Sequence, residues 1–406
     1  MRALAKHLVT HTPWSFVSSV SAGFGNYFLV VLLARFYTPD AVGEFRLLLS
    51  AIGMLALFSV FESGKILLRS VVEGNIAIAR PLFYYRLRWS MLGVVAGWSY
   101  AAWLFYHGNA LAIPVLIATA AAPFYYGADL YDYINQARSN FRTNAIYNSS
   151  KILIVLSFFA TGGILGVPTT ILFSGYFVIL ASCHSLFFWL EMRGVTTPPV
   201  DCAKAKRKSL FLSISTVPPL ILEHTDKLLI GLLMGIKPLG YYTVAVSTGR
   251  LVLYGISPLL TTINPLLVRK KVPGNKLVYV FIGFTILGIL TSYFIEIMYL
   301  RIYPAEYHQY FHLSKVIIWG VGLYCTYNLL YSSAVFHQDA ALRIPMISNW
   351  ISPAFIFVWL GASMLYGGDN KLLLCALSYP LRHLVGIVTI TLINYLWHKS
   401  SRSKVA

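Results

Sequence analysis

One short apolar segment near the middle of the chain holds four ionisable side chains. The stretch PPLILEHTDKLLIG contains Glu223, His224, Asp226 and Lys227. Glu223 and Lys227 are four residues apart with the acid first, which is the favourable orientation for an ion pair within a helix. Asp226 lies on the same broad face, and one carboxylate is enough to neutralise Lys227. The second carboxylate is then free to hold a coupling proton or Na⁺. The alternative is a structural salt bridge that faces the interior of a helical bundle.

Two prolines, Pro218 and Pro219, precede this cluster within the same apolar segment. Because a proline lacks the backbone N–H, the pair is expected to kink or interrupt the helix. In a transporter such a break lets a helix bend between states, which makes both prolines candidate gating residues. Packing around a fixed kink is the alternative.

Arginines also occur deep inside apolar segments. Arg250 and Arg382 lie ten or eleven residues into predicted helices, hence about 15 Å from the helix end at 1.5 Å per residue. At that depth a guanidinium must pair with an acid or line a water-filled cavity. Arg46 lies five residues into another apolar helix, and Arg35 closes the helix before it.

The elements that position these charges are apolar helices. The chain of 406 residues is 57% hydrophobic and 11% charged, against about 25% charged residues in a typical soluble protein. Its apolar runs approach or exceed the roughly 20 residues that cross a bilayer. We therefore predict an all-α integral membrane protein with about twelve transmembrane helices, at residues 12–36, 41–63, 88–106, 110–131, 143–163, 169–190, 209–234, 239–264, 277–299, 313–336, 344–366 and 371–396.

The distribution of basic residues predicts the orientation of these helices. Most of the 32 lysines and arginines fall on the side that also holds the N-terminus. By the positive-inside rule this side is cytoplasmic, and both termini lie there. The net charge of +18 is then explained by topology, and we expect no nucleic-acid partner. The four cysteines have no paired or metal-ligand spacing, so we also expect no disulfide and no metal site.

Acidic residues at the predicted cytoplasmic ends of helices are candidate gating residues. Glu62, Asp129 and Asp132 are each near a basic residue in the sequence (Lys65, Arg138 and Arg142). Such pairs could latch an inward-facing gate. Solvated charges at helix ends are the alternative.

Two short turns are repeated nearly half a chain apart. YTPDAVGEF at 37–45 and GIKPLGYYT at 235–243 each follow one apolar segment and open the next. A second echo, Arg142 with Asn148 and Arg343 with Asn349, shares a spacing of six residues. The chain is therefore predicted to contain two six-helix bundles in the same orientation, an arrangement that places a substrate between the halves. The predicted division is a first bundle at 1–192, a cytoplasmic linker at 193–208, a second bundle at 209–398 and a basic tail at 399–406.

These segments resemble a known family. FLVVLLARFYTPDAVGEFRLLLSAIGML is similar to the first two helices of the Wzx-type O-antigen and polysaccharide flippases, and DKLLIGLLMGIKPLGYYTVAVSTGRLVLYGISPLLTTINPLL is similar to their seventh and eighth helices. That family belongs to the multidrug, oligosaccharidyl-lipid and polysaccharide exporter superfamily. The resemblance implies a V-shaped pair of bundles in the bacterial cytoplasmic (inner) membrane that alternates between inward-open and outward-open states.

The resemblance also implies a cargo and a site. The cargo would be an undecaprenyl-pyrophosphate-linked oligosaccharide, moved from the cytoplasmic to the periplasmic leaflet. The site would be a cationic cavity lined by the first, second, seventh and eighth helices. Arg46 and Arg250 are then the leading phosphate ligands because a guanidinium reaches two phosphate oxygens in one plane. Lys227 lies behind them, Arg35 is a ligand or an interfacial anchor, and Arg382 is undecided.

Three functions from different classes stay open at this point. The first is this flippase, with membrane lipids and the polymerase, chain-length and ligase proteins of the same pathway as possible partners. The second is a multidrug or cation antiporter, which would favour an acidic cavity, whereas the deep residues here are mostly basic. The third is a membrane polymerase or ligase, which would need a large outer loop. The chain has no nucleotide-binding or hydrolase motif. We therefore expect no enzymatic activity and no cofactor beyond a coupling H⁺ or Na⁺.

Overall fold

The chain folds almost entirely into helices. The computed structural model describes residues 2–195, 202–269, 274–337 and 343–403. The α-helices are α1 (Arg2–Phe36), α2 (Pro39–Leu55), α3 (Ser63–Val72), α4 (Ala79–Tyr106), α5 (Ala112–Ala128), α6 (Leu130–Ala137), α7 (Phe141–Ile164), α8 (Thr169–Met192), α9 (Ala203–Ser215), α10 (Val217–Leu233), α11 (Ile236–Arg269), α12 (Gly274–Ile302), α13 (Ala305–His308), α14 (Phe311–Trp319), α15 (Val321–His337), α16 (Arg343–Tyr366) and α17 (Lys371–Ser403). The predicted all-α class is confirmed.

Most of these helices are membrane-spanning by length and composition. Within the described residues, nine segments are long and apolar enough to cross a bilayer: Phe16–Phe36, Pro39–Ser59, Ala112–Ala137, Phe141–Ile164, Thr169–Met192, Leu277–Ile302, Phe311–Tyr331, Ile347–Tyr366 and Gly368–Ile393. The protein is therefore a multi-pass membrane protein. The other three predicted spans correspond to α4, to α9 with α10, and to α11. Of these helices, α10 has 17 residues.

Several helix boundaries differ from the prediction, and two of the differences affect a buried arginine and the paired prolines. The third predicted span begins nine residues earlier, because α4 starts at Ala79 and includes Arg86 within the helix. The seventh predicted span is two helices, since α9 ends at Ser215 and α10 begins at Val217. Pro218 and Pro219 therefore occupy the first turn of α10, where a missing N–H costs nothing. The predicted interruption is confirmed, but it lies at a helix start and not at a kink inside one helix.

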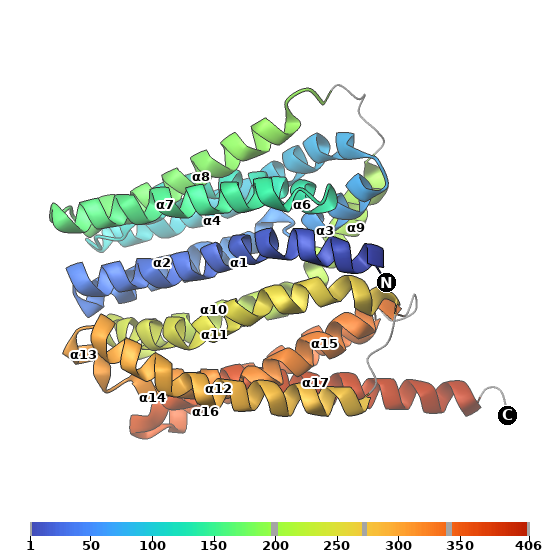
Figure 1. Cartoon of the computed structure of the whole chain (residues 1–406). Coiled ribbons are helices and arrows are strands. Elements are labelled where there is room, and N and C mark those ends of the chain that lie inside the picture. Colours follow the sequence, from blue (N-terminus) through green and yellow to red (C-terminus); the bar gives the residue numbers. More distant parts are fainter. Residues whose placement is uncertain (1, 196–201, 270–273, 338–342, 404–406) are drawn as a thin grey trace.

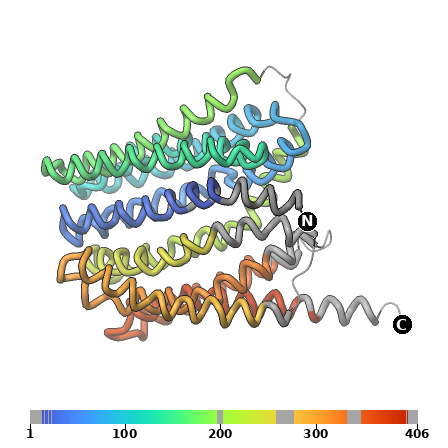
Figure 2. The backbone as a smooth tube through the Cα atoms, in the orientation of Figure 1, coloured from blue at the N-terminus to red at the C-terminus, as the bar shows by residue number. Residues whose placement is uncertain are grey.

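The helices form two groups that meet along four central helices. Figure 1 shows α4–α8 on one side, α12–α17 on the other, and α1, α2, α10 and α11 between them. The smooth trace in Figure 2 shows that the long helices of both groups run roughly along one common direction. Across the junction, α2 packs against α10 and α11, and α1 packs against α11.

The repeated turns lie at this junction. In the first turn, the Thr38 side chain caps α2 by accepting a hydrogen bond from the Ala41 amide, and Pro39 is the first helical residue. In the second, Gly235 has a φ of 104°, which ends α10 and lets the chain reverse into α11. The two turns therefore start α2 and α11 at the same end of the bundle, which we call the α2/α11 end.

Candidate functional site

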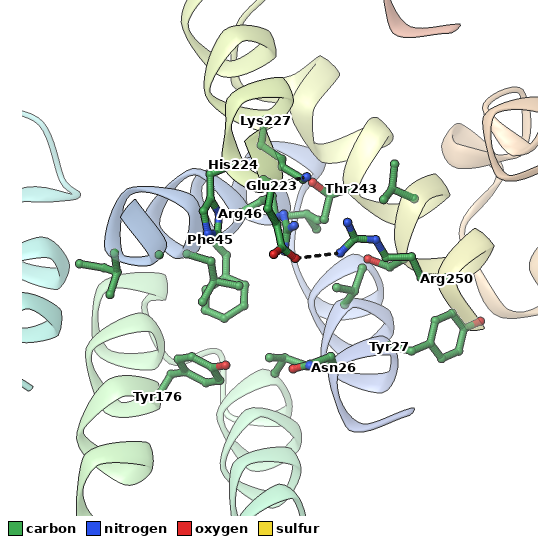
Figure 3. A pocket seen from close by; sticks show the side chains of 18 of the residues that line it. Asn26, Tyr27, Phe45, Arg46, Tyr176, Glu223, His224, Lys227, Thr243 and Arg250 are labelled. Atoms are coloured by element: carbon green, nitrogen blue, oxygen red, sulfur yellow. Dashed lines mark hydrogen bonds and ion pairs between the residues drawn. The ribbon is translucent and has the colours of Figure 1, made fainter. Parts of the chain in front are cut away.

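A cavity of about 380 Å³ lies between the two groups of helices. Its walls come from α1, α2, α10 and α11, with further residues from α5 and α8. The first four are the first, second, seventh and eighth predicted spans, as the resemblance implied. Figure 3 shows the polar side chains of Arg46, Glu223, His224, Lys227 and Arg250 at this cavity.

Arg46 provides the cavity with a cation that has no ion-pair partner among the described residues. It is half-buried on α2, one residue after the buried Phe45. In the described part of the chain the Arg46 guanidinium forms no hydrogen bond and no ion pair. A guanidinium held at a membrane-embedded cavity without an ion-pair partner is costly unless an anion or water solvates it.

Arg250 faces the cavity from α11 and is held there by two partners from other helices. Its guanidinium lies 3.9 Å from the Glu223 carboxylate, and it donates a 2.8 Å hydrogen bond to the Tyr379 hydroxyl. The Glu223 side chain is 49% exposed and that of Arg250 is 20% exposed, so the pair borders the open cavity. An incoming anion can therefore reach Arg250 and displace Glu223.

Lys227 is neutralised by Asp226, and not by Glu223, whose spacing from Lys227 favours a pair within the helix. The Lys227 ammonium lies 2.7 Å from the Asp226 carboxylate, and it donates to the backbone carbonyl of Glu223 instead of its side chain. Both Asp226 and Lys227 are almost fully buried. Tyr242 donates a 2.7 Å hydrogen bond to Asp226 from α11. The sequence spacing indicated an intrahelical pair, but Arg250 from another helix competes for Glu223.

Tyr379 of α17 connects these charges and was missed in the sequence. Its hydroxyl accepts hydrogen bonds from Lys227 and Arg250, each at 2.8 Å, and lies 3.4 Å from Asp226. Its ring lies 4.8 Å from the Arg250 guanidinium carbon. No local spacing indicates this role, because Tyr379 is more than 120 residues from its partners.

A second polar cluster lies in the first half of the chain. The Lys151 ammonium of α7 is within 3.2 Å of the Tyr131 hydroxyl, the Asn148 side-chain oxygen and the His184 Nε2 atom. His184 Nδ1 lies 2.9 Å from the Tyr125 carbonyl, so the ring donates there and accepts from Lys151. A recess of about 110 Å³ beside Lys151 shares four lining residues with the central cavity: Asn26, Leu29, Tyr125 and Tyr176. No feature of the sequence singles out this cluster, because its members come from α6, α7 and α8.

The candidate gating acids have different surroundings. Glu62 pairs with Lys65 at 2.7 Å, as predicted, and its backbone amide donates to Ser213 of α9, which joins the two halves. Asp129 pairs with the buried Arg86 of α4, so its predicted pairing with Arg138 or Arg142 is wrong.

Two further predicted pairings are also wrong. Asp132 accepts hydrogen bonds from Gln136 and Asn144. Arg138 pairs with Glu191, and the Arg142 guanidinium lies over the Trp14 ring. These contacts hold helices of the first half to one another.

The remaining predicted substrate ligands lie away from the cavity. Arg35 donates hydrogen bonds of 2.8 Å and 3.3 Å to the backbone carbonyls of Ile302 and Arg301, which end α12. It therefore caps a helix of the second half. Arg382 is half-buried on α17 and does not line the cavity.

The charges around the central cavity sum to a cationic site. Three cations (Arg46, Lys227 and Arg250) face two carboxylates (Glu223 and Asp226) among the described residues. The arrangement can bind an anion between Arg46 and Arg250. Within the same residues no group of three His, Cys, Asp or Glu side chains could hold a metal ion.

Comparisons with known proteins agree with this architecture. Among solved structures, the chain is similar to an inward-facing multidrug resistance MATE family transporter of the MOP superfamily, with 9% identity and a TM-score of 0.65 over 96% of this chain and 95% of that one. It is similar to the MATE transporter VcmN of Vibrio cholerae, with 12% identity and a TM-score of 0.63 over 99% and 98% of the two chains. The lipid II flippase MurJ in an inward closed conformation matches with 12% identity and a TM-score of 0.54 over 97% and 88%. At these identities the likeness shows the fold.

The sequence comparisons supply the family. A search of curated protein sequences finds no match to this chain. Residues 8–271, well over half of the chain, match the family model described as "Polysaccharide biosynthesis protein". The chain therefore belongs to the polysaccharide biosynthesis protein family and has the fold of MOP-superfamily transporters.

Proposed function

We propose that this protein is a flippase for a lipid-linked oligosaccharide. The observation that carries the proposal is Arg46, an unneutralised guanidinium on a cavity between the two halves of a transporter fold. Arg46 and Arg250 would bind the pyrophosphate that joins the glycan to undecaprenol, because guanidinium groups suit phosphate oxygens. Family membership supports a polysaccharide precursor as the cargo.

The cavity also suits the sugar part of such a cargo. Six tyrosines line it: Tyr27, Tyr125, Tyr126, Tyr176, Tyr242 and Tyr254. Aromatic rings offer an apolar face and a polar hydroxyl, so they can stack on sugar rings and hydrogen-bond their hydroxyl groups. These side chains therefore support a glycan and disfavour a purely apolar drug.

The proposed topology follows from the charges. Twelve crossings place both termini in the cytoplasm of a bacterial cell and the α2/α11 end on the periplasmic side of the inner membrane. The substrate would enter the cavity from the cytoplasmic leaflet and leave to the periplasmic leaflet as the halves rock about α1, α2, α10 and α11. The polymerase, chain-length and ligase proteins of the pathway would take up the product.

Glu223 offers a route for ion coupling. Phosphate that binds Arg250 displaces Glu223, and the released carboxylate can then take a proton or Na⁺. Asp226 would serve the same purpose only if Lys227 left it, and these two groups are buried in contact with each other. We therefore place the coupling ion at Glu223 first and at Asp226 second.

A multidrug or cation antiporter is the alternative, and the MATE neighbours favour it. An antiporter for cationic drugs would need surplus carboxylates at the cavity, whereas the surplus here is Arg46. A polymerase or ligase is the second alternative, and the resemblance of the fold to transporters argues against it.

The test is the leaflet in which the lipid-linked oligosaccharide accumulates. Cells that lack the gene should accumulate undecaprenyl-pyrophosphate-linked oligosaccharide in the inner leaflet, and the intact gene should restore surface glycan. Arg250→Ala should fail to restore it although the protein is made. Unchanged glycan pools together with altered tolerance of cationic drugs would reject the flippase in favour of the antiporter.

A further inference from the structure

A second cavity, of about 360 Å³, lies in the first half of the chain. It is lined by residues of α4, α5 and α8, and α5 packs against both of the other helices. It shares no lining residue with the central cavity. Its lining residues come from the start of α4, the end of α5 and the second half of α8. Figure 1 shows that α4 begins and α8 ends at the same end of the bundle. The proposed function makes no use of it.

Two arginines stand at the mouth of this cavity. Arg80 lies in the first turn of α4 and donates a 3.3 Å hydrogen bond to the Met192 carbonyl at the end of α8. Arg193 follows α8, and its guanidinium carbon lies 5.6 Å from the centre of the Trp189 ring. Both arginines are exposed, and neither pairs with a carboxylate in the described part of the chain. The mouth therefore carries two positive charges that the protein does not neutralise.

The inner wall of the cavity is aromatic. Phe83 of α4 and Phe188 of α8 stack with ring centres 4.8 Å apart. Phe124 of α5 and Trp189 are 45% and 56% exposed, so this wall faces lipid. The wall continues to Ser185, eight residues before Arg193, or about 12 Å along a helix at 1.5 Å per residue. A cationic mouth thus leads into an apolar groove.

We propose that this cavity binds an anionic glycerophospholipid. The lipid phosphate would lie between Arg80 and Arg193, and one acyl chain would follow Phe124 and Phe188 toward the bilayer centre. Basic pockets at helix ends on the cytoplasmic side attract anionic headgroups, and guanidinium groups bind phosphate oxygens in pairs. A soluble anion would gain nothing from the aromatic wall, and a neutral phospholipid would gain little from the two arginines.

Brominated lipids test the proposal on the full-length protein. Bromine atoms on an acyl chain quench a nearby tryptophan, and Trp189 lies in the cavity wall. The protein is reconstituted in phosphatidylcholine vesicles with a small fraction of phosphatidylglycerol, and the brominated chains are placed on one lipid or the other. We expect phosphatidylglycerol to quench at a mole fraction at least fivefold lower than phosphatidylcholine, and Trp189→Phe to remove that difference.

Two double variants separate the cavity from the general surface charge. Arg80→Gln with Arg193→Gln should abolish the preference for phosphatidylglycerol. Arg69→Gln with Arg207→Gln removes the same amount of charge from exposed residues on α3 and α9, and this variant should keep the preference for phosphatidylglycerol. If the first double variant does not fold, Arg193→Gln alone serves as the test, and it should reduce the preference for phosphatidylglycerol. This single variant should fold, because among the described residues the Arg193 guanidinium contacts the Trp189 ring and forms no ion pair.

Three results would overturn the proposal. One is equal quenching by the two brominated lipids in the unaltered protein. Another is an unchanged preference in both Arg193→Gln and the Arg80 double variant. The third is displacement of phosphatidylglycerol by a lower mole fraction of undecaprenyl phosphate, since the cavity would then belong to the carrier lipid.

Discussion

Gly43 of α2 and Gly240 of α11 pack against each other's helices in equivalent positions. A methyl group on Gly43 would meet the carbonyl oxygen of Ile236, the first residue of α11. A methyl group on Gly240 would meet the carbonyl oxygen of Pro39, the first residue of α2. Gly43 lies four residues after Pro39, which Gly240 contacts, and Gly240 lies four residues after Ile236, which Gly43 contacts. The repeated turn in the sequence is therefore a pair of helix starts related by approximate two-fold symmetry, which pack closely against each other at the α2/α11 end.

Gly43→Ala or Gly240→Ala should open this end. Small residues let two membrane helices approach closely, and an added methyl here meets backbone, which cannot move aside as a side chain can. Overpacking costs about 1–3 kcal/mol, which is roughly a 5- to 150-fold shift between two conformations. A cysteine at Ser247, which lines the cavity, reports the change through its labelling by an impermeant thiol reagent. Labelling from the periplasm should increase in both variants.

Gly255→Ala is the matched control for these variants. Gly255 is in the same helix α11, and a methyl group there would meet nothing within 4 Å. Labelling should stay as in the unaltered protein. If Gly43→Ala, Gly240→Ala and Gly255→Ala were all labelled to the same extent, the close packing of Gly43 and Gly240 against the facing helix starts would not control opening.

Arg46→Ala should weaken binding of the proposed pyrophosphate more than Arg46→Lys does. A hydrogen bond to a charged group contributes about 1.5–3 kcal/mol, so loss of the guanidinium should lower affinity by about 10- to 150-fold. Lysine keeps the charge but not the planar pair of donors, so the loss of affinity in Arg46→Lys should be intermediate. Binding of farnesyl pyrophosphate to the purified protein, by isothermal titration calorimetry, measures both. Thermal stability should not fall in Arg46→Ala, because this side chain has no partner among the described residues. A large fall in Tm without a change in affinity would make Arg46 structural.

The general fold follows from the sequence because membrane helices are encoded locally. Apolar length predicts most of the spans, and the prolines at the start of α10 predict a break. The turn residues Pro39 and Gly240 indicate the repeat, since helix starts and close contacts both require specific residue types. These features need no knowledge of which helices pack together.

The charge pairs of the site do not follow from the sequence, because they join distant segments. Glu223 has a cation four residues away on its own helix, but it pairs with Arg250 of the next helix. Arg86 lies outside the predicted span 88–106, yet it is part of α4 and pairs with Asp129 within the bundle. Tyr379 carries no local signal at all. Pairing in three dimensions decides each case, and one sequence does not contain that pairing.

Asp226 and Lys227 should behave as a structural pair. Breaking a buried ion pair by removing one partner costs about 3–5 kcal/mol, whereas replacing both by apolar residues of similar size is often tolerated. We therefore expect Asp226→Leu to lower Tm strongly, and Asp226→Leu with Lys227→Met to recover most of the loss. Transport in the double variant then separates the two roles. Retained transport would exclude Asp226 as the coupling site, and a stable but inactive protein would support it.

Asp129 should contribute to stability and not to gating, in contrast to Glu62. Arg86 is almost fully buried and Asp129 is 34% exposed, so Asp129→Asn should cost roughly 2–3 kcal/mol, less than a fully buried pair. Glu62 pairs with the exposed Lys65, so Glu62→Gln should cost under about 1 kcal/mol. Its backbone contact with Ser213 joins the two halves and would persist in that variant. Thermal unfolding of the two purified variants, together with their transport rates, measures the contrast. Asp129 would be a gating residue if Asp129→Asn kept the Tm and changed only the rate.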